Sequence, residues 1–102
     1  MAAAVGRKRQ TAASEKRLEK MEAQLGRWSA RIDRLVAVAE SAGARATIVE
    51  HQRNDELRAC RAIAQARFDE YRTSPVELRK GLRSGVEQAW NDLAAVMRSV
   101  RG

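Results

Sequence analysis

Apolar residues recur along the first half of the chain at alternating steps of three and four residues. This is the spacing of the a and d positions of a coiled coil, and it predicts an amphipathic helix over residues 14–42. We name the first part of this ladder the seam, which consists of Leu18, Met21, Leu25, Trp28, Ile32 and Leu35. An apolar seam needs burial against another helix, so we expect the functional surface of the protein to be the surface of a helix.

Gly43 is the weak point of this helix before the chain's single proline. In one interpretation Gly43 opens a tight turn, and a second helix over residues 44–72 runs antiparallel to the first. In the other the helix continues, because one glycine within a helix costs only about 1 kcal/mol. The apolar ladder continues past the glycine with Ala46 and Val49, which favours the continuous helix by a small margin.

Three signals around Pro75 mark the start of the last helix. Ser74 can cap a helix, Pro75 suits its first turn, and Glu77 lies three residues after the serine. The apolar positions that follow, including the two that widen the face, are Leu78, Leu82, Val86, Ala89, Trp90, Leu93, Val96, Met97 and Val100. The pattern predicts a helix over residues 75–99.

These patterns predict an all-α protein of long antiparallel coiled-coil helices, in one domain over residues 14–102, as a helical hairpin or a three-helix bundle. Alanine, arginine, glutamate and leucine dominate the composition, which suits helices and argues against a sheet. If the helix continues through Gly43, the last helix folds back on its second half, and the bare seam must dimerise. If the chain turns there, three helices bury the seam within one molecule. The sequence favours the first arrangement slightly.

The chain is basic, with a formal net charge of +7. Part of the excess lies in residues 1–13, where Arg7, Lys8 and Arg9 stand without an acidic residue. We expect this segment to be a disordered arm, whose three basic residues contact nucleic acid or an anionic membrane weakly. A tail that only improves solubility explains the same composition.

Charged residues flank the seam on two sides. Positions c and g, counted with Leu25 as position a, hold Arg17, Lys20, Arg27, Arg31 and Arg34. Positions b and e hold Glu15, Glu19, Glu22, Asp33 and Glu40. Flanking charges set orientation and partner choice in coiled coils, which predicts directed pairing with a complementary helix. An ordinary solvated surface explains them equally well.

Gly81, Gly85 and Ala89 are spaced by four residues and share one face of the last helix, next to Trp90. Glycine weakens a helix, and the close approach of another helix would offset that loss. We therefore predict close packing at these positions within a bundle.

The chain has no residue pattern of a catalytic or metal-binding site. No serine and aspartate pattern around His51, the single histidine, indicates a catalytic triad, and Cys60, the single cysteine, has no partner for an internal disulfide. We expect a protein that is not an enzyme, with no metal, no cofactor and no small-molecule substrate. No apolar run approaches the roughly 20 residues of a membrane span, and no apolar region follows the basic start as in a secretory signal. The expected location is the cytoplasm.

Two short patches carry a resemblance to a known family. They read Gln24-Leu25-x-x-Trp28-x-Ala30-x-Ile32-Asp33-x-Leu35 and Leu82-x-x-Gly85-Val86-Glu87-x-Ala89-Trp90-x-Asp92-Leu93. In order and separation they resemble the recurrent patches of small bacterial coiled-coil stress-response proteins, over residues 14–97. The resemblance implies a soluble, extended helical protein with no known enzymatic activity and no assigned ligand. This chain departs from typical members in being basic rather than acidic.

The seam and the resemblance together predict a non-enzymatic coiled-coil interaction protein, associated with stress, that acts by pairing helices. Its expected partner is a second copy of the chain or another helical protein. One alternative, based on the charge, is a small basic protein that binds nucleic acid or the nucleoid. Another is a protein that lies on a membrane surface through residues 75–100, where basic and apolar residues alternate.

Overall fold

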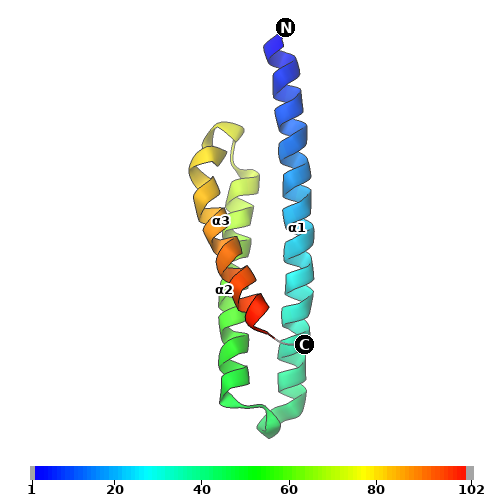
Figure 1. The fold of residues 1–102 in the computed structure, drawn as a ribbon, viewed down its shortest axis with the longest axis vertical. Coiled ribbons are helices and arrows are strands. Elements are labelled where there is room, and N and C mark those ends of the chain that lie inside the picture. Colours follow the sequence, from blue (N-terminus) through cyan, green and yellow to red (C-terminus); the bar gives the residue numbers. More distant parts are fainter. Residues whose placement is uncertain (1, 101–102) are drawn as a thin grey trace.

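The computed structural model describes residues 2–100, with side chains described from Glu15 to Val100. The helices are α1 (Ala2–Ala42), η1 (Gly43–Arg45, a short 3-10 turn), α2 (Ile48–Thr73) and α3 (Val76–Ser99). The chain runs down α1, back up α2 and down again along α3, with no strand in the described residues (Figure 1). The all-α fold predicted from the sequence is confirmed, as an elongated bundle of 66 × 20 × 19 Å.

The chain turns between α1 and α2, so the continuous helix that the ladder favoured is wrong. Gly43 adopts a φ of +55°, a left-handed conformation that only glycine adopts without strain. Thr47 and Glu50 then form a capping box at the start of α2. The Glu50 amide donates to Thr47 Oγ1 at 3.1 Å, and the Thr47 amide donates to Glu50 Oε2 at 3.3 Å. These two local features stabilise a turn that the apolar spacing did not reveal.

The N-terminus of α1 also differs from the sequence prediction. The helix begins at Ala2, whereas the sequence suggested a start at Ser14 after a disordered arm. Residues 2–14 contain several alanines and no proline, a composition that lets a helix propagate. The side chains of Arg7, Lys8 and Arg9 lie outside the described side chains, so their predicted anion contacts stay a prediction.

The turn between α2 and α3 lies where the sequence placed it, but Ser74 has another role there. Its backbone amide and its hydroxyl both donate to the Glu70 carbonyl oxygen, the hydroxyl at 2.6 Å. Ser74 therefore closes the end of α2, and Pro75 occupies the N-cap position of α3 without a side-chain cap. Proline fits there because it cannot continue α2 and its own φ of −56° leads into the next helix.

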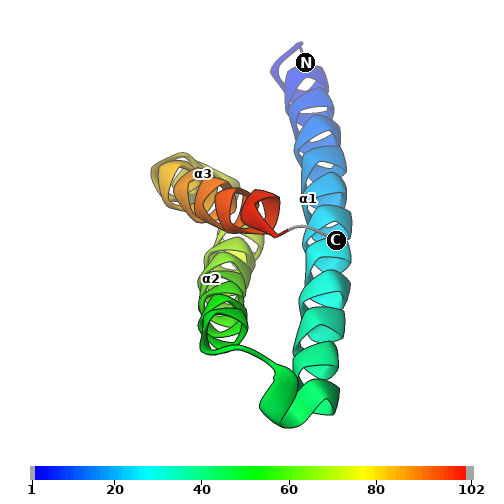
Figure 2. The same ribbon diagram turned by 60° about the horizontal axis from the view of Figure 1, so that its bottom comes forward.

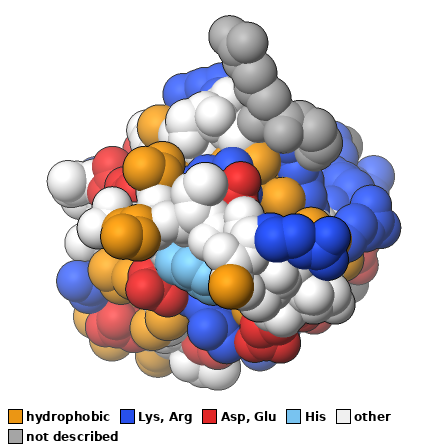
Figure 3. All heavy atoms as spheres, turned by 90° about the horizontal axis from the view of Figure 1, so that it is seen from below, with side chains coloured by type: hydrophobic (Ala, Val, Ile, Leu, Met, Phe, Trp, Pro, Cys, Tyr) orange, Lys and Arg blue, Asp and Glu red, His pale blue; other side chains and the backbone are white. Residues whose placement is uncertain are grey.

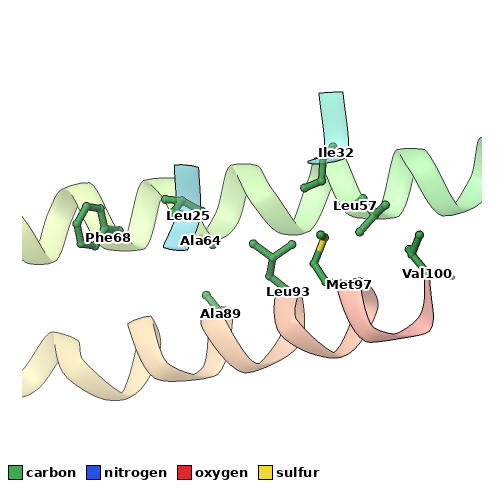
Figure 4. Packing of buried hydrophobic residues seen from close by; sticks show 9 residues of the cluster. All are labelled: Leu25, Ile32, Leu57, Ala64, Phe68, Ala89, Leu93, Met97 and Val100. Carbon is green, nitrogen blue, oxygen red and sulfur yellow. The ribbon is translucent and has the colours of Figure 1, made fainter. Parts of the chain in front are cut away.

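The core fills the space between the three helices. α2 and α3 make the most extensive contact, and their buried side chains point toward one another, with two α1 residues beside them (Figure 4). The buried residues of this cluster are Leu25, Ile32, Leu57, Ala64, Phe68, Ala89, Leu93, Met97 and Val100. The second view shows α3 crossing over α2 at an angle, with its end close to α1 (Figure 2).

The seam is covered by the chain's own later helices. Leu25 and Ile32 are 3% and 0% exposed, and the other four seam residues are half-buried against the same cluster. The arrangement in which a bare seam must dimerise is therefore wrong, because α2 and α3 provide the apolar surface that the seam needs.

Candidate interaction surface

The acidic flank of the seam faces α2, where it meets arginines. Arg61 Nη1 lies 2.7 Å from Asp33 Oδ1, and Arg72 Nη1 lies 3.6 Å from Glu22 Oε1. Arg61 also donates to the Ser29 carbonyl oxygen at 3.5 Å. Such exposed pairs each contribute under about 1 kcal/mol, but they favour one orientation of the hairpin. For two of the five acidic residues of this flank, the complementary charge is therefore supplied within the chain.

The side of α1 that faces α3 is held by an aromatic junction. The Trp90 ring lies 5.8 Å from the Trp28 ring and 5.7 Å from the Phe68 ring, measured between centroids, so it joins α3 to both other helices. Trp90 Nε1 donates to Gln24 Oε1 at 3.0 Å, which satisfies the polar end of this half-buried ring. Near the end of α3, Arg31 Nη2 donates to the Val100 carbonyl oxygen at 3.1 Å.

Of the four residues for which close packing was predicted, two are packed as expected and two are not. Ala89 is buried in the core, and Trp90 forms the aromatic junction. A β-carbon at Gly81 would have no described atom within 4 Å beyond its chain neighbours and the adjacent backbone of its own helix, and at Gly85 the nearest such atom would be Arg67 Cδ at 4.0 Å. The close backbone approach predicted at the two glycines is therefore wrong for the described structure, because a long arginine side chain, rather than a helix backbone, lies over Gly85.

A row of cations on the outward face of α1 is left exposed by this packing. We name Lys16, Lys20, Arg27 and Arg34 the basic stripe. All four are exposed, and at 3.6 residues per turn they lie within an arc of about 40° opposite the core. Viewed from the α1–α2 turn, Lys and Arg side chains gather at the edge of the molecule on the α1 side (Figure 3).

Three of the four stripe residues have no acidic neighbour one turn away on their own helix, whereas Lys16 has Glu19 three positions later. No acidic residue lies three or four positions from Lys20, Arg27 or Arg34, which are the distances at which side chains meet on a helix. No ion pair joins the stripe to any other residue whose side chain is described. Three of these cations occupy heptad positions that predict a flank of the seam. Their angular positions around the helix axis, at about 100° per residue, show that they align with Lys16 although the heptad assigns Lys16 to another position.

The environment of Cys60 does not activate its thiol. Burial raises the pKa of the Cys60 thiol, and the nearby Glu56 and Asp92 carboxylates raise it further. A raised pKa keeps this thiol protonated, which lowers its nucleophilicity. Between Glu15 and Val100, no cluster of three histidine, cysteine or carboxylate side chains is placed to hold a metal ion.

The apolar stripe of α3 packs into the bundle. Val86, Leu93 and Met97 are each at most 3% exposed, while Val76 and Leu78, at the start of the helix, are about three-fifths exposed. Among the described large apolar side chains of the predicted membrane-surface helix, those exposed to solvent thus lie only in its first turn. Among the described residues, no helix has both the length and the apolar character required to cross a membrane.

Comparison with protein-family models, curated proteins and solved structures finds no match to this chain. The stress-response family suggested by the two sequence patches therefore stays a prediction. Those patches contact one another, since Trp28 and Gln24 of the first meet Trp90 of the second. Their aromatic residues have a structural role that accounts for their presence.

Proposed function

We propose that this chain is a non-enzymatic interaction protein that binds an anionic macromolecule through the outward face of α1. The observation that carries the proposal is the exposed basic stripe, which no ion pair joins to another described side chain. A row of like charges on one face of a helix raises the local concentration of an oppositely charged partner and speeds its association. It also repels itself, so an anionic partner relieves an unfavourable interaction.

The packing of the bundle explains why this surface is favoured over the seam. α2 and α3 cover the seam, and Arg61 and Arg72 pair with the acidic flank. Pairing of helices through the seam, as the sequence suggested, would require this core to open. The basic stripe needs no such rearrangement, because it is exposed in the folded chain.

Affinity chromatography on heparin, a generic polyanion, tests the proposal. Wild-type protein is compared with the variant Lys20→Glu, Arg27→Glu, Arg34→Glu, and with the matched control Arg58→Glu, Lys80→Glu, Arg98→Glu. The control residues are also exposed, lie on α2 and α3, and change the net charge equally. We expect the stripe variant to elute at about half the wild-type salt concentration or lower, and the control to elute near the wild type.

Circular dichroism of each variant establishes that the helices are intact. Failure of wild-type protein to bind heparin at low salt would overturn the proposal. Equal losses in the two variants would also overturn it, because binding would then follow total charge rather than one face.

A further inference from the structure

We infer that the partner of the basic stripe is double-stranded DNA, contacted at its phosphate backbone without recognition of base sequence. This inference rests on the proposed function, since it names the polyanion that α1 binds. The surface is the outward face of α1. The length of the stripe, the small side chains beside it and the lack of aromatic residues on this face favour duplex DNA as the partner.

The geometry of the stripe suits a long and regular polyanion. Lys16 to Arg34 spans 18 residues, or about 27 Å of straight helix at a rise of 1.5 Å per residue. The cations recur at intervals of four and seven residues, so they project in one line along a rigid element. Duplex DNA presents one negative charge about every 1.7 Å along its axis, so many phosphates face a row of this length.

The side chains next to the stripe are small. Gly26, Ala23, Ala30 and Ala37 are all exposed on the outward half of α1. Short side chains allow a helix backbone to come near the surface it lies on, and the major groove of B-form DNA is wide enough for a helix. Double-stranded RNA is less suitable, because its major groove is deep and narrow.

The same neighbours argue against a membrane surface. A helix that lies in a membrane interface inserts large apolar side chains beside its cations. Among the described residues of this outward face, the one large apolar side chain is Val38, beyond the end of the stripe and 62% exposed. Alanine supplies too little apolar area to hold α1 in a lipid interface.

The aromatic residues favour a duplex over a single strand. Proteins that bind single strands without sequence preference stack the bases on exposed aromatic side chains. Trp28 and Trp90 instead pack against each other, and the four stripe positions hold lysine and arginine only. The backbone phosphates of a duplex require cations alone.

Within residues 2–100, no other helix lies on this side of α1 (Figure 1). α2 and α3 lie on the opposite face, and α1 extends past the α2–α3 turn at its N-terminal end (Figure 1). In the sequence, Arg9 occupies the same heptad position as Lys16, seven residues earlier. The sequence of the extension therefore holds one further basic residue at a stripe position.

Fluorescence anisotropy with a labelled 30-base-pair DNA duplex tests the inference on the full chain. We expect two duplexes of unrelated sequence to bind with similar affinity. The logarithm of the association constant should fall with the logarithm of salt concentration with a slope of about −3 to −4, since each of four contacts contributes about −0.9. The variant Lys20→Gln, Arg27→Gln, Arg34→Gln should bind at least tenfold more weakly, with a slope near −1. The matched variant Arg58→Gln, Lys80→Gln, Arg98→Gln should stay within about threefold of the wild type.

Competition with other polyanions separates the inference from the proposed function. Retention on heparin without duplex binding would overturn the DNA inference and leave the proposed function standing. Tighter binding to single-stranded DNA, to duplex RNA or to vesicles containing phosphatidylglycerol would also overturn it. An equal loss of affinity in both glutamine variants would overturn it as well, because the DNA would then not bind at the stripe.

Discussion

At the scale of the residue, Asn54 shows why apolar spacing alone marks the buried face of α2 incompletely. The helix buries Asn54, Leu57, Ala64 and Phe68, and half-buries Arg61, at alternating steps of three and four. Two of these five core-facing positions are polar. A search for apolar spacing passes over them and selects Val49 instead, which is 72% exposed. Hydrophobicity alone could not locate the buried face of α2, because part of that face is defined by hydrogen bonds and an ion pair.

The buried amide of Asn54 is incompletely satisfied, which leads to a prediction. Asn54 is 5% exposed, and its Nδ2 donates to the Leu35 carbonyl oxygen at 3.3 Å, but its Oδ1 has no partner in the described structure. Asn54→Leu should raise the free energy of unfolding by about 1 kcal/mol, because it replaces an unsatisfied polar group with an apolar one of similar size. Urea denaturation followed by circular dichroism measures the change. Asn54→Asp, which buries a charge at the same place, should lower stability; a stabilising Asn54→Asp would contradict this explanation.

At the scale of the element, the sequence predicted helices well and their partners poorly. The seam pattern specified that one face of α1 is buried, and Leu25 and Ile32 are indeed in the core. It could not specify the partner, because an apolar seam is buried equally well by a later helix of the same chain or by another chain. The deciding signals were local, in the left-handed Gly43 and in the Thr47–Glu50 capping box. The residues that form them are present in the sequence, but the heptad spacing carries no information about a left-handed glycine or a capping box.

The α1–α2 turn therefore predicts how the assembly could be changed. Gly43→Ala places a Cβ at a φ of +55°, which costs about 1–2 kcal/mol for a non-glycine residue. The segment Ala42–Ala46 then favours a continuous helix, in which α1 of one chain packs on α2 and α3 of another. We expect a larger dimer fraction than in wild-type protein, measured by analytical ultracentrifugation over a range of concentrations.

The control for this experiment is Gly43→Asn, since asparagine adopts the left-handed conformation more readily than alanine. This variant should dimerise less than Gly43→Ala. If Gly43→Ala leaves the dimer fraction unchanged, the turn does not depend on the conformation of this residue, and the capping box alone determines the hairpin.

At the scale of the whole molecule, the three helices are not joined equally. α2 and α3 share an extensive interface, whereas α1 meets α3 through a few specific side chains. Among these, Trp90 contacts Trp28 and Gln24 of α1 and Phe68 of α2. The sequence placed both tryptophans on apolar stripes, but it could not show that they meet, because they lie on helices separated by α2. Trp90 is consequently the residue on which the closure of α1 onto α3 depends most.

This central position predicts a large and specific effect of substitution. Trp90→Ala should lower the free energy of unfolding by about 3–5 kcal/mol, since it removes a large ring from the junction of all three helices. Trp90→Phe should cost less, because it keeps the aromatic contacts and loses the hydrogen bond to Gln24. Leu78→Ala, at a position 61% exposed on the same helix, should change stability by no more than about 0.5 kcal/mol.

Urea denaturation followed by circular dichroism gives all three values, and the fluorescence of Trp28 reports whether its ring becomes exposed in Trp90→Ala before the helices melt. If Trp90→Ala were as mild as Leu78→Ala, α1 would be held to the bundle chiefly by its contact with α2, and the stripe on its outer face would move with the α1–α2 hairpin rather than with the whole bundle.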